Sequence, residues 1–205
     1  MCCYKISIFV GTKESTLDSN IDLFNFNILI MAKKVAVLVV NPVNGFGLFH
    51  YLESFYENGI PYKTFAVAPA TQVKTNSGIS IQTDDVIANL KGHEADYDAL
   101  VFACGDAMPK FGENAGKPEN QDLIAVIQAF GDKEKIIAGH CVAALIFDIA
   151  GIAKGKKVAL HPYIKDAVTG ATGTNETTVV DGNIYTAQTE NAIGSLLTKL
   201  LEALK

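Results

Sequence analysis

Runs of consecutive apolar residues recur along the chain from residue 34 onward. The first, at 34–40, reads KVAVLVV, and another unbroken run stands at 99–103. Such runs are typical of strands buried on both faces of a parallel sheet. Two further strands are expected at 62–67 and 135–139. The segments between the strands predict helices at 47–58, at 84–90 behind a cap formed by Asp84 and Asp85, and at 121–130.

The predicted element order is β-α-β-α-β-α-β, which is the order of a doubly wound sheet. The other expected elements are a hairpin at 72–81, a helix at 142–150, a strand at 157–160, a hairpin turning at Asp181-Gly182 and an amphipathic helix at 190–204. We therefore expect an α/β fold in which a mostly parallel sheet carries helices on both faces. Residues 31–205 are expected to form a single domain.

The first thirty residues show no sustained helical or strand period, and the pattern changes abruptly at Met31. Acidic residues such as Glu14 and Asp18 interrupt the segment, which excludes a signal peptide, and it is too short to span a bilayer. We expect 1–30 to be a disordered extension or the product of a mis-assigned start codon. A targeting or docking segment is the alternative interpretation.

Composition limits the classes of function. The chain has 205 residues, of which 49% are hydrophobic, and its net charge is −5. All 17 basic residues are lysine, so no guanidinium is present, and neither nucleic acid nor an anionic membrane is an expected partner. Cys2, Cys3, Cys104 and Cys141 lack C-x-x-C spacing, which predicts reduced thiols in a cytoplasmic protein. We expect no bound metal and no cofactor.

The candidate chemistry lies where predicted strands end, because ligands of open parallel sheets bind outside the carboxyl ends of the strands. Cys141 stands where a strand turns directly into a helix, and the small residues Gly139 and Ala143 flank it. This spacing predicts a strained backbone at the cysteine, and the helix N-terminus is expected to lower the pKa of its thiol. We interpret Cys141 as a nucleophilic thiolate, the alternative being a buried structural cysteine.

Four segments together resemble the ThiJ/PfpI superfamily: KKVAVLVV from Lys33, VFACGD ending at Asp106, AGHCVAA around Cys141, and AGIAKGKKVALHPYIKDAV at 150–168. The spacing from Cys141 to Gly151 is similar to that of the family. The resemblance covers 33–205 and implies a homodimer with a flavodoxin-like three-layer sandwich, similar to class I glutamine amidotransferases. It implies a small-molecule substrate rather than a nucleic acid or a membrane.

The same resemblance assigns roles to individual residues. Cys141 matches the nucleophile, and the backbone amides of Gly105 and Val142 match the donors of an oxyanion hole. His161 matches the histidine that faces the cysteine in many members. These roles imply a hydrolase, lyase or deglycase acting on a small carbonyl, thioester or amide substrate.

The sequence departs from the family at several positions. Val142 stands where protease-like members have a histidine, and His140 precedes the cysteine instead, so His140 is either packed in the core or a base. No acid lies between Lys34 and Glu53, where deglycase-like members have a glutamate. Asp106 is either a substitute for that carboxylate or a turn residue. Cys104 replaces a family glycine and either fills a tight turn or pairs with Cys141.

Three classes of function therefore compete. The first is a cysteine-dependent enzyme, and the second is a stress sensor or chaperone that works through oxidation of Cys141 without turnover. The third, a glutamine amidotransferase, lacks support because His161 is followed by Pro162 and Tyr163 rather than by an H-x-E motif. Peptidase activity is disfavoured by Val142.

Overall fold

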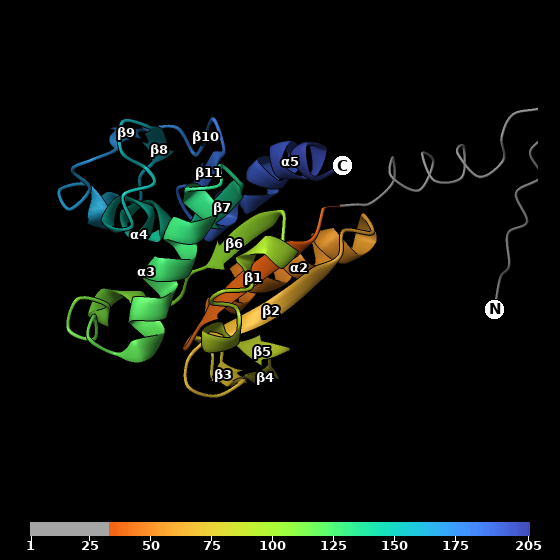
Figure 1. Cartoon of the computed structure of the whole chain (residues 1–205). Helices are drawn as coiled ribbons and strands as arrows, with labels where there is room; N and C mark the ends of the chain where they lie inside the picture. Colours follow the sequence, from red (N-terminus) through yellow and green to blue (C-terminus); the bar gives the residue numbers. More distant parts are fainter. Residues whose placement is uncertain (1–32) are drawn as a thin grey trace, which may run out of the picture. The chain divides into compact units, whose positions relative to one another are not determined.

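The computed structural model describes residues 33–205, and its centre is a seven-stranded sheet (Figure 1). The strand order is β10 (Thr178–Asp181), β11 (Ile184–Ala187), β7 (Ile136–His140), β6 (Ala99–Ala103), β1 (Val35–Val40), β2 (Tyr62–Val67), β5 (Asp85–Val86). Every neighbouring pair is parallel except β10 and β11, which are antiparallel. The mostly parallel sheet expected from the sequence is confirmed.

The two unbroken apolar runs form the middle of this sheet. All residues of β1 and of β6 are buried, so neither strand has a solvent-facing side. Leu38 in β1 pairs with Phe65 on one side and with Phe102 on the other, and these three side chains are all in the core. Removing such surface from water is the main stabilising contribution in a fold of this kind.

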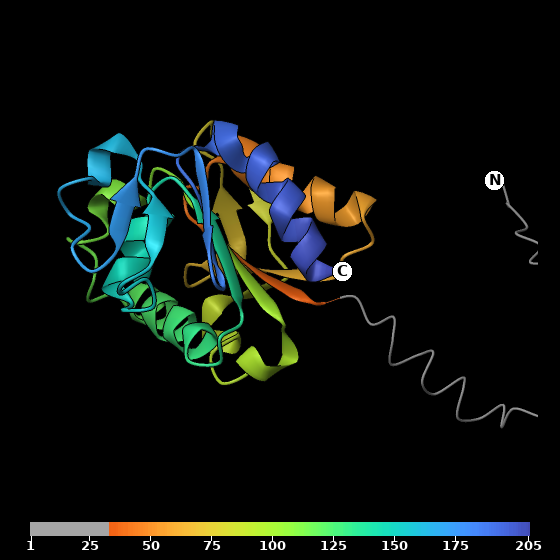
Figure 2. The ribbon, with the colours of Figure 1, turned by 90° about the horizontal axis from the view of Figure 1, so that it is seen from above.

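Helices cover both faces of the sheet, as expected. The four α-helices are α2 (Gly45–Glu57), α3 (Pro118–Gly131), α4 (Ala143–Ile149) and α5 (Ile193–Leu204). Figure 2 shows α2 and α5 on one face and α3 and α4 on the other, which gives three layers. The apolar stripe of α5, formed by residues such as Leu196 and Leu200, is completely buried, and its charged residues lie on the opposite side.

Two small sheets lie outside the central one. The expected hairpin at 72–81 is β3 (Gln72–Lys74) paired with β4 (Ser80–Gln82), and the expected strand at 157 is β8 (Lys157–Ala159), paired with β9 (Thr172–Thr174). The turn between β10 and β11 has Gly182 at φ +60°, a conformation that favours glycine. Single 3-10 turns occupy Ile87–Asn89, Glu94–Asp96, Met108–Lys110, Pro162–Ile164 and Glu190–Ala192.

The prediction of a helix at 84–90 is wrong. The side chain of Asp84 accepts hydrogen bonds from the amide of Thr64 at 2.7 Å and from its hydroxyl at 2.6 Å, so it does not cap a helix. Asp85 instead begins the edge strand β5, and only one 3-10 turn follows it, at Ile87–Asn89. An aspartate pair that resembles a helix cap therefore serves to dock an edge strand onto β2.

The two ends of the described chain meet beside the sheet. The amide of Lys33 donates a hydrogen bond to the carbonyl oxygen of Leu204 at 3.4 Å, and the Lys33 ammonium bonds to the carbonyl of Ala203. The interpretation of 1–30 concerns residues that lie outside the described part. Within 33–205, no helix is both long enough and apolar enough to cross a membrane.

Candidate active site

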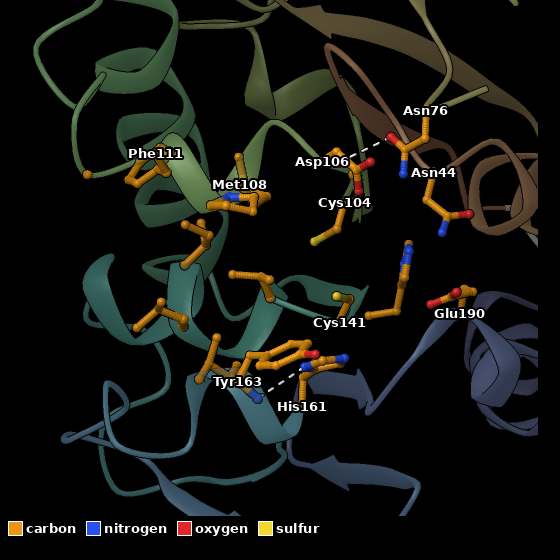
Figure 3. Close-up of a pocket in the computed structure, with 18 of the residues that line it drawn as sticks. Asn44, Asn76, Cys104, Asp106, Met108, Phe111, Cys141, His161, Tyr163 and Glu190 are labelled. Carbon is orange, nitrogen blue, oxygen red and sulfur yellow. Dashed lines mark hydrogen bonds between the residues drawn. The ribbon is translucent and has the colours of Figure 1, made fainter. Parts of the chain in front are cut away.

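The carboxyl ends of β1, β6 and β7 border a cavity of about 660 Å³ (Figure 3). All seven residues proposed from the sequence line it: Cys104, Gly105, Asp106, His140, Cys141, Val142 and His161. The location follows the general rule for open parallel sheets, in which the connections leaving adjacent strand ends enclose the ligand site.

Cys141 adopts the left-handed backbone conformation expected at the turn between strand and helix. Its φ is +57°, and its amide donates to the carbonyl oxygen of Ala187 at 3.0 Å. A Cβ atom at Gly139 would lie 2.5 Å from the Cβ of Ala143, so these two positions require small residues. The turn directs the Cys141 side chain into the cavity, where Figure 3 shows its sulfur.

Gly105 lies against the backbone of the loop that follows β1. A Cβ atom here would stand 2.2 Å from the carbonyl oxygen of Pro42 and 2.4 Å from the Cα of Val43. Within residues 33–205, the N–H groups of Gly105 and Val142 donate to no backbone oxygen. Two N–H donors on the wall of the cavity that are free of backbone acceptors are the arrangement that an oxyanion hole requires.

The thiol of Cys141 differs from the expected low-pKa thiolate. Burial raises its pKa, and the amide of Val142 opposes that shift, while the negative charges of Glu190 and Asp106 add to it. The expectation considered only the helix N-terminus, whereas the folded chain adds an apolar surrounding and two carboxylates. Ionisation of Cys141 therefore needs a nearby proton acceptor, or a bound substrate that offsets the burial and the negative charges.

Cys104 directly follows β6 and is only 2% exposed. Burial raises its pKa well above the ordinary value, the nearby Cys141 adds to the shift, and the amides of Val142 and Ala143 oppose it. Its carbonyl oxygen accepts from the amide of Asn44 at 2.9 Å, which joins the ends of β1 and β6. Both cysteines are free thiols in the structure.

His140 is packed in the core beside the cavity. Only 1% of its surface is exposed, and its ring lies 5.7 Å from that of Tyr51. Neither ring nitrogen has a hydrogen-bond partner among residues 33–205, and burial lowers the pKa of His140 to about 4. A Cβ atom at Gly47 would meet Nε2 at 2.7 Å, so that glycine makes room for the imidazole.

The buried imidazole predicts a loss of stability in mild acid. The pKa of His140 is lower in the folded chain than the ordinary 6.5. As the pH falls from 6.5 to 4, the unfolded chain therefore binds a proton at His140 that the folded chain does not bind. We expect the free energy of unfolding to fall by up to ~3 kcal/mol over this interval. Urea unfolding at several pH values measures this slope.

The control for this prediction is an exposed histidine. His93 is 70% exposed and lies 3.8 Å from Asp96. His140→Gln should flatten the dependence of stability on pH between 4 and 6.5, whereas His93→Gln should leave it as steep as in the parent protein. Equal slopes in the two variants would contradict the assignment of the acid sensitivity to His140.

His161 begins the 3-10 turn at Pro162–Ile164 and lies on the cavity wall. Its Nδ1 accepts a hydrogen bond from the amide of Tyr163 at 3.3 Å, and the two rings stack with their centres 5.1 Å apart. Because Nδ1 is an acceptor, the proton of the neutral ring is on Nε2. The neutral imidazole can therefore donate a hydrogen bond from Nε2 within the cavity.

Three polar residues on the wall were not expected from the sequence: Asn44, Asn76 and Glu190. The side chain of Asn44 caps α2 by accepting from the Gly47 amide at 2.9 Å, and that of Asn76 accepts from the Asp106 amide at 3.2 Å. Among the described residues, the Asp106 carboxylate caps no helix or turn. Only Asn44, which starts a helix directly after a strand, had a signal in the sequence.

The cavity has a polar side and an apolar side. In Figure 3, Asn44, Asn76 and Glu190 lie to one side of Cys141, and Met108 and Phe111 lie to the other. The apolar side also includes Pro109, Leu145, Ile146, Ile149 and Ile164. Among the residues described, no group of three histidine, cysteine or acidic side chains has the arrangement of a metal site.

Comparison with known proteins agrees with this geometry. Residues 33–203 match the DJ-1/PfpI family. The chain belongs to the DJ-1/PfpI family. The resemblance inferred from the four sequence segments and the flavodoxin-like fold expected from it, similar to class I glutamine amidotransferases, are confirmed.

Members of the DJ-1/PfpI family are found at high and at low identity. Protein ppBat of Bacteroides thetaiotaomicron is 59% identical over 175 residues, which make up 85% of this chain and 100% of that protein. The crystal structure of a protein named "putative protease I" from the same species is 59% identical, has a TM-score of 0.84, and covers 85% of this chain and 100% of its own. Drosophila melanogaster DJ-1beta shares the fold at 20% identity, with a TM-score of 0.73, covering 85% of this chain and 91% of its own.

Proposed function

We propose that this protein is a cysteine-dependent hydrolase or lyase for a small carbonyl, thioester or amide compound, with Cys141 as nucleophile. The left-handed backbone at Cys141, φ +57°, carries the proposal, because such strain is retained where it aims a functional side chain. It directs the thiol into a cavity beside the N–H groups of Gly105 and Val142, which donate to no backbone oxygen within residues 33–205.

The chemistry follows from these positions. The sulfur of Cys141 attacks the carbonyl carbon, and the electron pair of the broken π bond moves to the carbonyl oxygen, which the amides of Gly105 and Val142 stabilise. Glu190 accepts the thiol proton as the sulfur attacks and returns it to the leaving group as the tetrahedral intermediate collapses, while the Nε2–H of His161 donates a hydrogen bond to that group. In a hydrolase, water then attacks the acyl-cysteine and returns the thiol.

We assign to Glu190 the role of the glutamate that deglycase-like members have and this chain lacks. It lines the cavity, and its charge acts on the Cys141 thiol. The chain has no acid between Lys34 and Glu53, and the loop after β1 contributes Asn44 to the cavity wall. The Glu190 carboxylate, which follows β11, can accept the thiol proton and return it during turnover.

The walls favour an uncharged substrate with an apolar substituent. Asp106 and Glu190 make the polar side acidic, and among residues 33–205 no lysine lines the cavity. The chain also contains no arginine, so a phosphate or carboxylate group on the substrate would meet repulsion without a cation to bind it. An alkyl or acyl group would fill the space beside Met108 and Leu145.

A redox sensor without turnover is the second candidate. It is favoured by the adjacent Cys104 and by the lack of an acid between Lys34 and Glu53, where deglycase-like members have a glutamate. Peptidase activity has less support, because a cavity of about 660 Å³ suits a small molecule better than an extended peptide.

We also retain the homodimer as a prediction. Phe46, Phe49 and Tyr56 on α2 are 61%, 42% and 78% exposed, and large apolar side chains gathered on one helix are common at interfaces between subunits.

The proposal is tested by selective alkylation followed by a substrate panel. In a Cys2→Ser/Cys3→Ser protein, iodoacetamide should modify Cys141 alone, because Cys104 is 2% exposed. Acyl thioesters of increasing chain length should then be hydrolysed with rising kcat/KM, and prior alkylation should remove this activity. A protein whose Cys141 resists alkylation and that turns over no member of the panel would refute the proposal.

A further inference from the structure

Cys104 and Cys141 directly follow two adjacent strands. The register of β6 and β7 ends with Phe102 opposite Gly139, and each cysteine lies two residues beyond that pair. Neighbouring strands lie about 4.8 Å apart. The Cα atoms of disulfide-bonded cysteines lie roughly 4.4–6.8 Å apart, so this register brings the pair into disulfide range.

The side chains of both cysteines line the same cavity. Figure 3 shows the two sulfur atoms facing each other in the cavity. Each thiol also borders the amide of Val142, and Cys141 contributes to the raised pKa of Cys104, which places both sulfurs in one small space.

Both backbones are held from outside the pair. The carbonyl of Cys104 accepts from the amide of Asn44 at 2.9 Å, and the amide of Cys141 donates to the carbonyl of Ala187 at 3.0 Å. Bond formation between the sulfurs therefore requires side-chain rotation rather than a rearrangement of the strands.

Access to the two thiols is unequal. Cys141 is partly exposed on the cavity wall, whereas Cys104 is 2% exposed beneath it. An oxidant from solvent therefore reaches Cys141 first, and Cys104 can react only with a group already formed on Cys141.

We propose that Cys104 is the resolving cysteine of a reversible peroxide switch on this site. The inference rests on the reactivity of Cys141 that the proposed function assumes. It adds that oxidation of Cys141 ends in an internal disulfide, which takes away the nucleophile until a thiol reductant restores it.

The reaction has two balanced steps. The Cys141 sulfur attacks one oxygen of a hydroperoxide, the O–O bond breaks, and the other oxygen leaves as water or an alcohol, which gives a sulfenic acid at Cys141. The Cys104 sulfur then attacks the Cys141 sulfur and loses its proton, so the S–S bond forms as the S–O bond breaks and water leaves. Two electrons from the two thiols reduce the peroxide.

The test uses the full chain with Cys2→Ser and Cys3→Ser, treated with hydrogen peroxide at low protein concentration. Intact-mass measurement should show the loss of two hydrogens, and both thiols should become resistant to iodoacetamide together. After cleavage at lysine without reduction, the disulfide should hold peptides 92–110 and 136–154 together. Dithiothreitol should separate the two peptides and restore both thiols.

Cys104→Ala is the matched variant, with its fold checked by circular dichroism. It should form no internal disulfide and should carry sulfinic acid at Cys141 under the conditions that give the parent protein a disulfide. Sulfinic acid in the parent protein, or a disulfide between chains, would overturn the inference while rapid alkylation of Cys141 left the proposed function intact. A Cys141 inert to both iodoacetamide and peroxide would overturn both.

Discussion

Gly105→Ala is expected to lower the free energy of unfolding by at least ~3 kcal/mol, because the three atoms nearest to the new methyl group belong to the backbone. The Cβ would stand 2.2 Å from the oxygen of Pro42, 2.4 Å from the Cα of Val43 and 2.7 Å from the nitrogen of Asn44. None of these is the end of a flexible side chain, so the loop after β1 must move as a whole. Urea unfolding measures the change.

The control for this variant is Gly116→Ala. A Cβ atom at Gly116 meets nothing within 4 Å, and its φ is not positive, so its stability should change by less than ~0.5 kcal/mol. If both variants unfolded at the same urea concentration, the close contact between the Gly105 turn and the loop after β1 would be refuted. The displaced loop in Gly105→Ala would also move the amide of Asn44 away from the cavity.

The second large effect concerns Cys141. Two substitutions at this position should both remove catalysis, but they should differ in stability. Removing the thiol in Cys141→Ala or Cys141→Gly should reduce thioester turnover by roughly 10³-fold or more, because the covalent step is lost. The left-handed φ of +57° costs a residue with a Cβ atom about 1 kcal/mol, and glycine avoids that cost. Cys141→Gly should therefore be more stable than Cys141→Ala by ~1 kcal/mol.

This order reverses the usual one, since glycine is destabilising relative to alanine at most positions in regular structure. Ala144, inside α4 and buried, gives the comparison: Ala144→Gly should lower stability by ~1 kcal/mol or more. Thermal and urea unfolding of the variants measure these differences. A Cys141→Gly protein less stable than Cys141→Ala would contradict the strain that we assign to the turn.

The parts of the fold that could be predicted from the sequence are those whose cause is local. The runs at 34–40 and 99–103 are apolar throughout because β1 and β6 have no exposed face. The small residues around Cys141 predicted its conformation because the steric conflict lies within a few residues. In both cases, the sequence near the element contains the whole physical reason for it.

The features that escaped prediction have causes distant in the chain. Asp84 and Asp85 resemble a helix cap, and the competing partner, Thr64, becomes visible only when β2 lies beside them. Glu190 reaches the cavity because β11 pairs with β7, and no local pattern in the sequence near Glu190 reveals that pairing. The raised pKa of Cys141 likewise depends on burial and on charges contributed by other segments.

The contact between Lys33 and Leu204 brings the two ends of the described chain together. The order of the elements along the chain could therefore be changed without changing their arrangement in space. The amide of the first residue described bonds to a carbonyl one residue before the end of the chain. A short linker across this contact would close the domain into a ring, and the turn at Gly182 between β10 and β11, which is exposed, offers a place to reopen it. Such a circular permutant would keep the ends of β1, β6 and β7 together, so the cavity belongs to the topology of the sheet rather than to the point at which the chain begins.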